Sequence, residues 1–264
     1  MHWDNKIHKF AEVSEKAEIG ENVEIGAFTV IEEGVKIGDF TKIENNVHIK
    51  KGTIIGKNCH IHSGCVLGDI PQDLSFKGGE SFLIIGDNVV IRENCVFHRA
   101  SGEGNATIVE DGAYLMTYTH IAHNVRVGKN VIIANGAQLA GYVEVEEKAF
   151  LSGLVAVHQF VRIGRYAMIG GCTKLIKDVP PYTLCDGNPA RVYGLNLIGL
   201  KRAEFSFEKI KMLKDLIHIL YKDASWEYRL KEIEKYDEDE AKILLEFLRN
   251  SNRGITEASW RRTK

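Results

Sequence analysis

The sequence predicts a mainly β protein, built as a solenoid of six-residue repeats and completed by a small α-helical domain at its C-terminal end. Two observations predict this fold: an aliphatic residue recurs at every sixth position over most of the chain, and the apolar spacing becomes helical after residue 206. We expect the solenoid to occupy residues 1–189 and the helical domain to occupy residues 190–264.

The six-residue period is nearly unbroken. Stepping by six from Ile7 to Leu175, 26 of 29 positions are Ile, Val, Leu or Phe, and the exceptions are Asp73, Gly79 and Glu103. Composition alone would place such residues at about a third of positions. The period matches neither an α-helix nor the simple alternation of an isolated strand. It is typical of a solenoid in which each unit contributes a short strand and a turn around a continuous aliphatic core.

Small residues follow the same register. Glycine often comes directly after the aliphatic position, as at Gly38 and Gly56, and we expect these glycines to form tight corners with positive φ. Cys59, Cys65 and Cys172 fall at small-residue positions of the repeat, where we expect inert packing thiols.

Two interruptions mark places where the chain leaves the solenoid. The register is lost near residues 69–84 and again near residues 98–107, and it resumes in phase each time. A solenoid accepts insertions where they project as loops, and such loops commonly carry function. The first insertion contains a polar cluster and is the stronger candidate for a functional loop.

The repeat ends near Asp178, and Pro180 and Pro181 stop the regular pattern. Beyond it the sequence predicts three helices, which begin near Ser206, at Trp226 and near Asp239; the second ends near Tyr236 and the third near Arg249. The first helix has one apolar face, which is formed by Ile210, Leu213, Leu216, Ile217 and Leu220.

Composition excludes several classes of protein. The 264-residue chain has a formal net charge of -2, whereas a general nucleic-acid binder is normally strongly basic. No stretch reaches the roughly 20 apolar residues that a transmembrane helix needs. The first residues, from Met1 to Lys6, do not resemble a secretion signal. Five cysteines without a CxxC pair fit reduced thiols, and we expect a cytoplasmic protein.

The strongest chemical signal comes from the length of one coil. If three repeats make a coil of 18 residues, His123 and Gly141 are stacked directly on each other. An imidazole can take a proton from a hydroxyl or an amine, and a glycine N–H can stabilise the oxyanion of an acyl transfer. With a thioester donor this chemistry needs no metal, cofactor or covalent enzyme intermediate, and we expect none.

Histidines also allow a metal site. His120, His123 and His158 could supply imidazoles to zinc, as happens in carbonic anhydrases with hexapeptide repeats, but the sequence offers no convincing complete ligand set. We expect His60 and His62, within the earlier coils, to be surface or packing residues.

Ordered motifs make the resemblance to a family specific. The segments that carry it are Gln72-Asp73-Leu74, Ile91-Arg92-Glu93, His98-Arg99, His120-Ile121-Ala122-His123, Leu139-Ala140-Gly141, Ala156-Val157-His158-Gln159-Phe160, Gly170-Gly171-Cys172, Asp178-Val179-Pro180-Pro181-Tyr182, Gly187-Asn188, Gly199-Leu200-Lys201-Arg202 and Arg253-Gly254. In this order they resemble the UDP-N-acetylglucosamine O-acyltransferases. The resemblance covers nearly the whole chain and implies a left-handed parallel β-helix, a homotrimer, and transfer of a 3-hydroxyacyl chain from acyl carrier protein to the 3-hydroxyl of UDP-N-acetylglucosamine in lipid A biosynthesis.

The same resemblance implies roles for individual residues. His123 matches the general base and the amide of Gly141 matches the oxyanion donor. The resemblance places Gln72 and Asp73 against the acyl chain and sugar, and Gly171 at the position that measures the acyl chain. The other matched substrate-binding residues are His98, His120, His158 and Gln159 in the cleft, and Asn196 and Arg202 for the uridine diphosphate.

Several positions depart from the family pattern. Asn124 replaces a common aspartate, Ser75 a lysine, Tyr142 a histidine and Ala203 an arginine. These departures leave open an N-acyltransferase that acts on a 3-amino UDP-sugar and forms an amide.

Two further questions are whether the chain is a catalyst and whether its C-terminal part binds a partner. A non-catalytic hexapeptide scaffold that binds a sugar nucleotide would keep the repeats, although the presence of His123 and Gly141 counts against it. Residues 190–264 carry 16 Lys and Arg against 13 Asp and Glu, so their net charge is +3. This surface is either simply solvated or docks the acidic acyl carrier protein.

Overall fold

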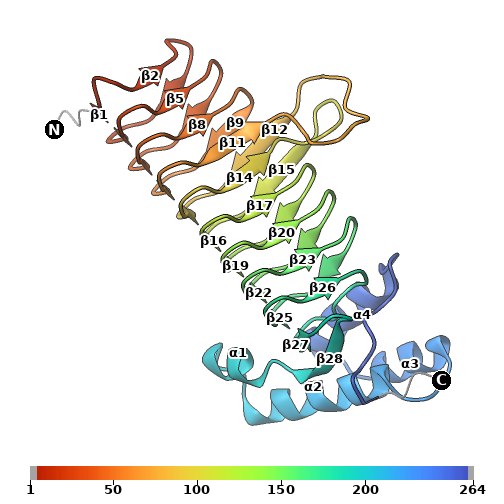
Figure 1. Ribbon diagram of the computed structural model, residues 1–264. Helices are drawn as coiled ribbons and strands as arrows, with labels where there is room; N and C mark the ends of the chain where they lie inside the picture. Colours follow the sequence, from red (N-terminus) through yellow and green to blue (C-terminus); the bar gives the residue numbers. More distant parts are fainter. Residues whose placement is uncertain (1–4, 261–264) are drawn as a thin grey trace.

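A computed structural model describes residues 5–260, which form a left-handed parallel β-helix with α-helices gathered at its C-terminal end (Figure 1). The fold class predicted from the six-residue period is therefore confirmed. Residues 1–4, part of the segment in which no secretion signal is expected, and residues 261–264 lie outside the described residues.

Three sheets form the faces of the solenoid. The first sheet contains, in order, β1 (Lys6–Ile7), β4 (Glu24–Ile25), β7 (Lys42–Ile43), β10 (His60–Ile61), β13 (Val90–Ile91), β16 (Tyr114–Leu115), β19 (Ile132–Ile133), β22 (Phe150–Leu151), β25 (Met168–Ile169), β27 (Thr183–Asp186) and β28 (Arg191–Leu195). The second sheet contains β2 (Glu12–Val13), β5 (Val30–Ile31), β8 (His48–Ile49), β11 (Val66–Asp69), β14 (Val96–His98), β17 (His120–Ile121), β20 (Gln138–Leu139), β23 (Ala156–Val157) and β26 (Lys174–Leu175). The third sheet contains β3 (Glu18–Ile19), β6 (Lys36–Ile37), β9 (Thr53–Ile55), β12 (Phe82–Ile85), β15 (Ala106–Val109), β18 (Arg126–Val127), β21 (Glu144–Val145) and β24 (Arg162–Ile163).

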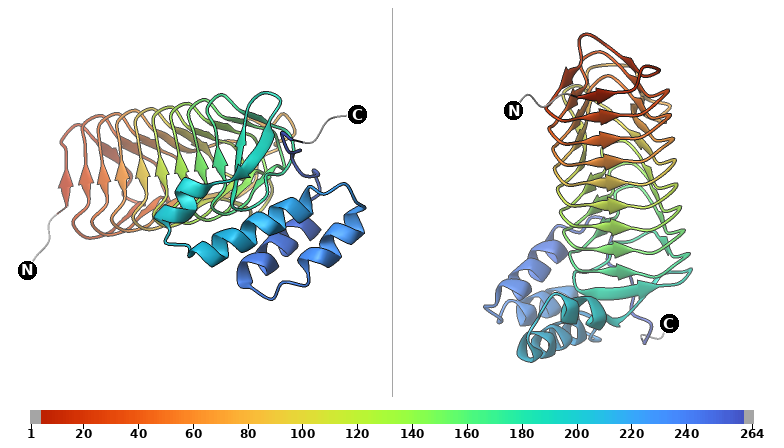
Figure 2. Two further views of the ribbon diagram at one scale, coloured as in Figure 1. Left: turned by 90° about the horizontal axis from the view of Figure 1, so that it is seen from below. Right: turned by 90° about the vertical axis from the view of Figure 1, so that its left-hand side faces the viewer.

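Successive coils are in register along the whole stack. Each strand pairs in parallel with the strand one coil later, as Ile7 does with Ile25 and Ile121 with Leu139, and both pairs are separated by 18 residues. Two views at right angles show the coils stacked along one axis (Figure 2). Residues at equivalent positions of successive coils therefore lie above one another, and their side chains form columns along the stack.

The aliphatic register forms the core of this stack. Its members from Ile25 onward are buried, whereas Ile7 in the first described coil is 46% exposed because no further coil covers it. A second buried ladder, which includes Val23, Val35 and Val47, lies two residues before each aliphatic position. Burying a single such side chain contributes about 1.5–3 kcal/mol, so the two ladders together hold the solenoid.

The glycines that follow the aliphatic position are required for a different reason from the one that the sequence predicts. Among them only Gly68 has positive φ, and the prediction for the others is wrong. A Cβ on Gly38 would lie 2.6 Å from the carbonyl carbon of Gly56 in the next coil. The left-handed residues instead come two positions later, as at Asn22 and Asn58, with φ of 56° and 54°. Glycine is needed because coils stack closely, and asparagine tolerates the left-handed turn.

The predicted packing role of the cysteines holds for two of the three. Cys59 and Cys65 are buried in the core, but Cys172 is exposed at a left-handed corner with φ of 58°. Its predicted position in the core is wrong because corner side chains point away from the core.

The chain leaves the stack between β11 and β12 and again between β14 and β15, and the two loops project side by side (Figure 1). They are tied together, since the amide of Gly104 donates to the carbonyl oxygen of Glu80 at 2.8 Å and the amide of Arg99 donates to that of Asp69 at 3.0 Å. Strands β11, β12 and β15 have four residues each and β14 has three, more than the two-residue strands of most coils, and these strands form the bases of both loops.

The stack ends in an antiparallel hairpin. Strand β27 pairs in parallel with β25, and β28 then pairs with β27 in the opposite direction. The proposed domain boundary after residue 189 falls in the turn between these two strands. The sequence did not predict this hairpin, because its strands lie beyond the end of the six-residue register.

Four helices follow: α1 (Leu197–Arg202), α2 (Phe207–Leu220), α3 (Trp226–Ile233) and α4 (Asp239–Arg249). The first of these was not predicted, and α3 ends before Tyr236. Leu213, Leu216, Ile217 and Leu220 of the predicted apolar face are buried. The chain then returns to the solenoid, where the amide of Asp178 donates to the carbonyl oxygen of Gly254 at 2.9 Å. Within residues 5–260 no helix has both the length and the apolar character that a bilayer span requires.

The glycine columns predict a stability difference. We expect Gly38→Ala to lower the free energy of unfolding by about 2 kcal/mol, because the new methyl group must displace backbone of the next coil. Gly153→Ala is the matched control, since its Cβ would meet only the carbonyl oxygen of Asn135 at 3.4 Å. Urea unfolding at one protein concentration measures both variants, and equal midpoints would contradict the close-packing explanation.

Candidate active site

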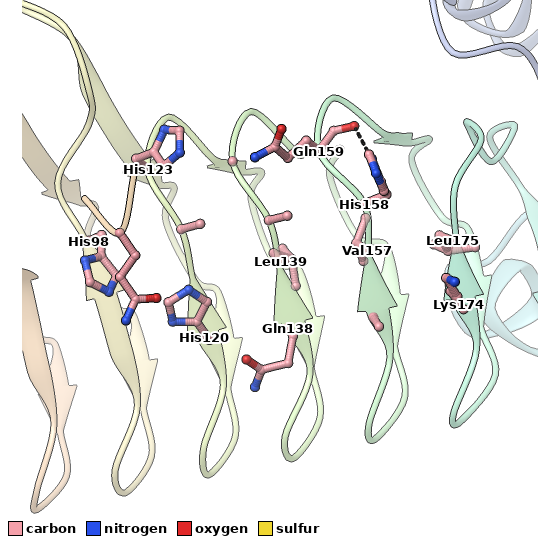
Figure 3. A pocket seen from close by; sticks show the side chains of 15 residues that line it. His98, His120, His123, Gln138, Leu139, Val157, His158, Gln159, Lys174 and Leu175 are labelled. Carbon is pink, nitrogen blue, oxygen red and sulfur yellow. Dashed lines mark hydrogen bonds between the residues drawn. The ribbon is translucent and has the colours of Figure 1, made fainter. Parts of the chain in front are cut away.

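A groove of about 410 Å³ follows the outer face of the second sheet (Figure 3). Its lining combines imidazole and amide side chains with apolar ones: Gln72, His98, His120, Ala122, His123, Gln138, Leu139, Ala140, Gly141, Ala156, Val157, His158, Gln159, Lys174 and Leu175. Seven of the predicted site residues are thus brought together in one place, and they are Gln72, His98, His120, His123, Gly141, His158 and Gln159.

The strand register positions the floor of the groove. His120 pairs with Gln138, Gln138 with Ala156, and Ala156 with Lys174, so these side chains form one outward column on β17, β20, β23 and β26. His98 ends β14 in the preceding coil, and its ring lies edge-on to that of His120 with centroids 5.2 Å apart. Gln138 and Lys174 are not among the predicted site residues, although one and three coil lengths added to His120 lead to them.

His123 lies at the corner that follows β17 and is 6% exposed. Its Nδ1 lies 2.9 Å from Oδ1 of Asn124, and because that oxygen can only accept, Nδ1 carries the proton. The network therefore assigns the free lone pair to Nε2. An imidazole in this tautomer is ready to accept a proton from a group that enters the groove.

Asn124 is itself held by the second loop. Its Oδ1 accepts from the amide of Ser101 at 2.9 Å, and its Nδ2 donates to the carbonyl oxygen of Ser101 at 3.1 Å. The amide of Asn124 donates to Oγ1 of Thr107 at 2.8 Å. These bonds fix which end of the amide faces His123, so asparagine can orient the ring although it supplies no negative charge.

Gly141 lies one coil beyond His123, as the 18-residue coil predicts. A Cβ at Gly141 would lie 2.7 Å from Nε2 of His123, so the ring covers the glycine backbone and no larger residue fits there. Among the described residues, no group accepts a hydrogen bond from the amide of Gly141. At the same corner position in other coils, the amides of Glu21 and Ala27 donate to Asp39 and Asn45 of the next coil.

Two histidines, His98 and His120, contribute imidazole rings to the groove. Burial, and then the neighbouring His98, lower the pKa of His120 to about 4. His98 is 5% exposed; its Nδ1 contacts the carbonyl oxygen of Ile70, and its buried Nε2 has no hydrogen-bond partner among the described residues. A buried ring nitrogen without a partner favours a ligand that would supply one.

The first loop brings a carboxylate close to this site. The hydroxyl of Ser75 donates to Oδ1 of Asp73 at 2.7 Å, and the amide of Ser75 donates to the same oxygen at 2.9 Å. These two bonds hold the pKa of Asp73 below its usual range. Asp73 does not line the groove itself, but it carries negative charge beside the imidazole.

Aromatic rings lie beside His123 at the corner. The ring of Tyr142 meets the ring of His123 edge-on, with centroids 5.3 Å apart and planes at 90°. Phe160 stacks on Tyr142 at 4.8 Å. These rings, together with Asn124, restrict the orientation of the imidazole.

Besides Asp73, three predicted site residues lie outside the groove of a single chain. Gly171 is at the corner between the first and second sheets, where a Cβ would meet only the carbonyl oxygen of Gly153 at 3.5 Å. The side chain of Asn196 caps α1 through the amide of Gly199 and donates to the carbonyl oxygen of Tyr166. Arg202 is exposed in the last turn of α1.

Family models match three parts of the chain. The model described as domain 2 of UDP-N-acetylglucosamine O-acyltransferase matches residues 178–256. Bacterial transferase hexapeptide repeats match residues 34–69 and 106–141, and the hexapeptide repeat of succinyl-transferase matches residues 16–51.

Curated and solved relatives agree with these matches. An acyl-[acyl-carrier-protein]--UDP-N-acetylglucosamine O-acyltransferase of Aliarcobacter butzleri is 44% identical over 95% of this chain and 98% of its own length. The Synechocystis protein of the same name is 46% identical, and the match spans 62% of this chain and 59% of that relative. The crystal structure of UDP-N-acetylglucosamine acyltransferase from Bacteroides fragilis has a TM-score of 0.92 at 39% identity, covering 95% of this chain and 99% of that one.

The depressed pKa of His120 predicts how stability depends on pH. An unfolded histidine binds a proton near pH 6.5, whereas folded His120 does so only near pH 4. Between these values the unfolded state binds more protons, so stability falls as the pH falls. We expect His120→Gln to reduce this slope between about pH 6.5 and 4.

Urea midpoints across this pH range measure the effect. His48→Gln, which changes an exposed histidine of the second sheet, is the matched control and should keep the slope of the unmodified protein. Equal slopes for His120→Gln and the unmodified protein would contradict the prediction.

Proposed function

This chain belongs to the UDP-N-acetylglucosamine O-acyltransferase family, and we propose that it transfers a 3-hydroxyacyl chain from acyl carrier protein to the 3-hydroxyl of UDP-N-acetylglucosamine. This reaction would serve lipid A biosynthesis. The observation that carries the proposal is the stacking of the His123 imidazole on the Gly141 backbone, whose amide donates to no described group.

The proposed mechanism uses these two groups directly. Nε2 of His123 takes the proton of the sugar 3-hydroxyl as its oxygen attacks the thioester carbonyl carbon. The amide of Gly141 donates to the oxyanion that develops on the carbonyl oxygen. When this intermediate collapses, the C–S bond breaks, and the imidazolium returns its proton to the thiolate of the carrier. The products are the acylated sugar nucleotide and the free carrier thiol, and no cofactor takes part.

The remaining groove residues would hold the substrates. Gln72 and the ionised Asp73 come from the first loop and could contact the acyl chain and the glucosamine ring. His98, with a buried Nε2 that lacks a partner, and neutral His120 suit the hydroxyls of the sugar. His158 and Gln159 lie farther along the same groove.

We propose that a homotrimer completes the cleft. Gly171, Asn196 and Arg202 lie outside the groove of their own chain, so a neighbouring subunit would have to bring such residues to it. Arg202 is exposed and free to meet a diphosphate, for which a guanidinium is well suited. The side chain of Asn196 would then act by shaping the first turn of α1.

We also propose a cytoplasmic location and docking of acyl carrier protein on the mildly basic C-terminal part. The five cysteines are free, in keeping with a reducing compartment. Exposed lysines and arginines of residues 190–264 are the candidates for contact with the acidic carrier.

An acyl-transfer assay tests the proposed reaction and its base. We expect the protein to convert 3-hydroxyacyl carrier protein and UDP-N-acetylglucosamine into an ester, and His123→Ala to lower the rate by at least about 100-fold. The 3-amino analogue of the sugar nucleotide is assayed in parallel, and mass spectrometry distinguishes ester from amide.

His48→Ala serves as the control, because it changes an exposed histidine on the same sheet outside the groove. Preference for the amino analogue would identify the N-acyltransferase instead. No turnover with any acyl donor would favour a non-catalytic scaffold, and turnover unaffected by His123→Ala would reject the assigned base.

The proposed acyl-measuring position generates a separate prediction. Since a Cβ at Gly171 meets no atom closer than 3.5 Å, a side chain can be added without disturbing the coil. We expect Gly171→Met to shift the preferred donor to a shorter acyl chain, with roughly tenfold or greater loss of kcat/KM for the longest donors. Gly171→Ala should shift it less. Competition among 3-hydroxyacyl carriers of different length measures the preference, and an unchanged preference in active Gly171→Met would contradict the assignment.

A further inference from the structure

A second cluster of ligand-type side chains lies on the outer face of the first sheet, away from the groove. Glu44 follows β7, and His60 and His62 lie on and directly after β10 in the next coil. One ligand atom from each of the three lies within 4.8 Å of the others. None of these residues has a part in the acyl transfer described above.

The three ligand atoms converge on one point. Oε1 of Glu44 lies 2.9 Å from Nε2 of His60 and 3.2 Å from Nδ1 of His62. The two rings stack with centroids 3.9 Å apart and an interplanar angle of 26°, and one nitrogen of each ring lies close to the same carboxylate oxygen. In a tetrahedral zinc site with bonds of 2.0–2.1 Å, ligand atoms are about 3.3 Å apart, so a small widening would admit the ion.

Ser63 orients the carboxylate of Glu44 through two hydrogen bonds. Its other oxygen, Oε2, accepts from the hydroxyl of Ser63 at 3.0 Å and from the amide of Ser63 at 3.3 Å. Oε1 is therefore the atom that faces the imidazoles. Metal ligands are commonly held in this way by hydrogen bonds from outside the coordination sphere.

Charges around the cluster favour a cation. Glu93 lies 3.7 Å from Nδ1 of His62, and its charge is balanced by Arg92, whose Nη2 lies 2.8 Å from Oε1 of Glu93. The carboxylate of Glu44 is the charged member of the cluster and attracts a cation.

We propose that Glu44 Oε1, His60 Nε2 and His62 Nδ1 bind one divalent transition-metal ion, with zinc the best match. Two imidazoles and one carboxylate are nitrogen and oxygen ligands that zinc accepts, and water would complete the coordination. All three side chains are partly exposed, so an ion can reach them from solvent.

The site would join two successive coils immediately before the first loop leaves the stack. Glu44 belongs to one coil and both histidines to the next, so the ion would clamp β7 to β10 next to β11. An ion bound to the folded state alone raises its stability. The inference is thus a structural metal site that is separate from the catalytic groove.

Metal titration of the full-length protein after EDTA treatment and dialysis tests the site. We expect calorimetry with zinc to give one ion per chain, and cobalt to give an absorption band typical of nitrogen and oxygen ligands. His60→Ala combined with His62→Ala should weaken binding at least about 100-fold, and Ser63→Ala about tenfold because it removes the hydroxyl that orients Glu44. Zinc should also raise the unfolding temperature of the unmodified protein.

His48→Ala is the control for histidine content and should leave zinc affinity unchanged. His60→Gln with His62→Gln provides a second pair of variants in case the alanine pair unfolds, and circular dichroism checks both. Unchanged zinc affinity in a folded double variant, or binding no tighter than about millimolar in the unmodified protein, would overturn the proposal. Loss of binding in His120→Ala with His158→Ala instead would place the ion in the groove and would overturn it too.

Discussion

Parallel stacking of 18-residue coils over an aliphatic ladder is the constraint on which the rest of the molecule depends. Each coil is bonded to the next through its backbone, so a residue is fixed above the residue one coil away. Residues at equivalent positions of successive coils therefore form columns of side chains. The groove lies along a column that contains His120, Gln138 and Lys174. A side chain in such a column cannot shift by one position without turning its neighbours away from the core.

This constraint explains why much of the site could be predicted. The period is a property of the sequence alone, and it gives the buried register. The number of repeats per coil is not given by the period; three per coil is what the family resemblance implies, and the stacking of His123 on Gly141 follows from the 18-residue coil that results. The resemblance also matched His98, His120 and His158 to residues of the same cleft, and the structure places all three in the groove.

Other features depend on three-dimensional detail that the period does not contain. The sequence predicts positive φ for the glycines after the aliphatic residue, but the closeness of the next coil is what requires them. Distances between coils cannot be read from a sequence. Hairpin β27–β28 and helix α1 lie where the register has ended, so no pattern predicted them. The cluster of Glu44, His60 and His62 depends on side-chain orientation across two coils and on the support of Ser63.

The proposed catalytic centre lies at a corner whose backbone amide donates to no group among the described residues. At some other corners, such as Glu21 and Ala27, the amide donates to an aspartate or asparagine of the next coil and is not available to a ligand. The residue one coil beyond Gly141 is Gln159, whose side chain does not accept this bond, and the amide of Gly141 stays available for a substrate oxygen. Beside it, the second loop holds Asn124 through Ser101, and Asn124 in turn holds His123. An insertion in the solenoid thus orients the imidazole, while the neighbouring amide is left for a substrate.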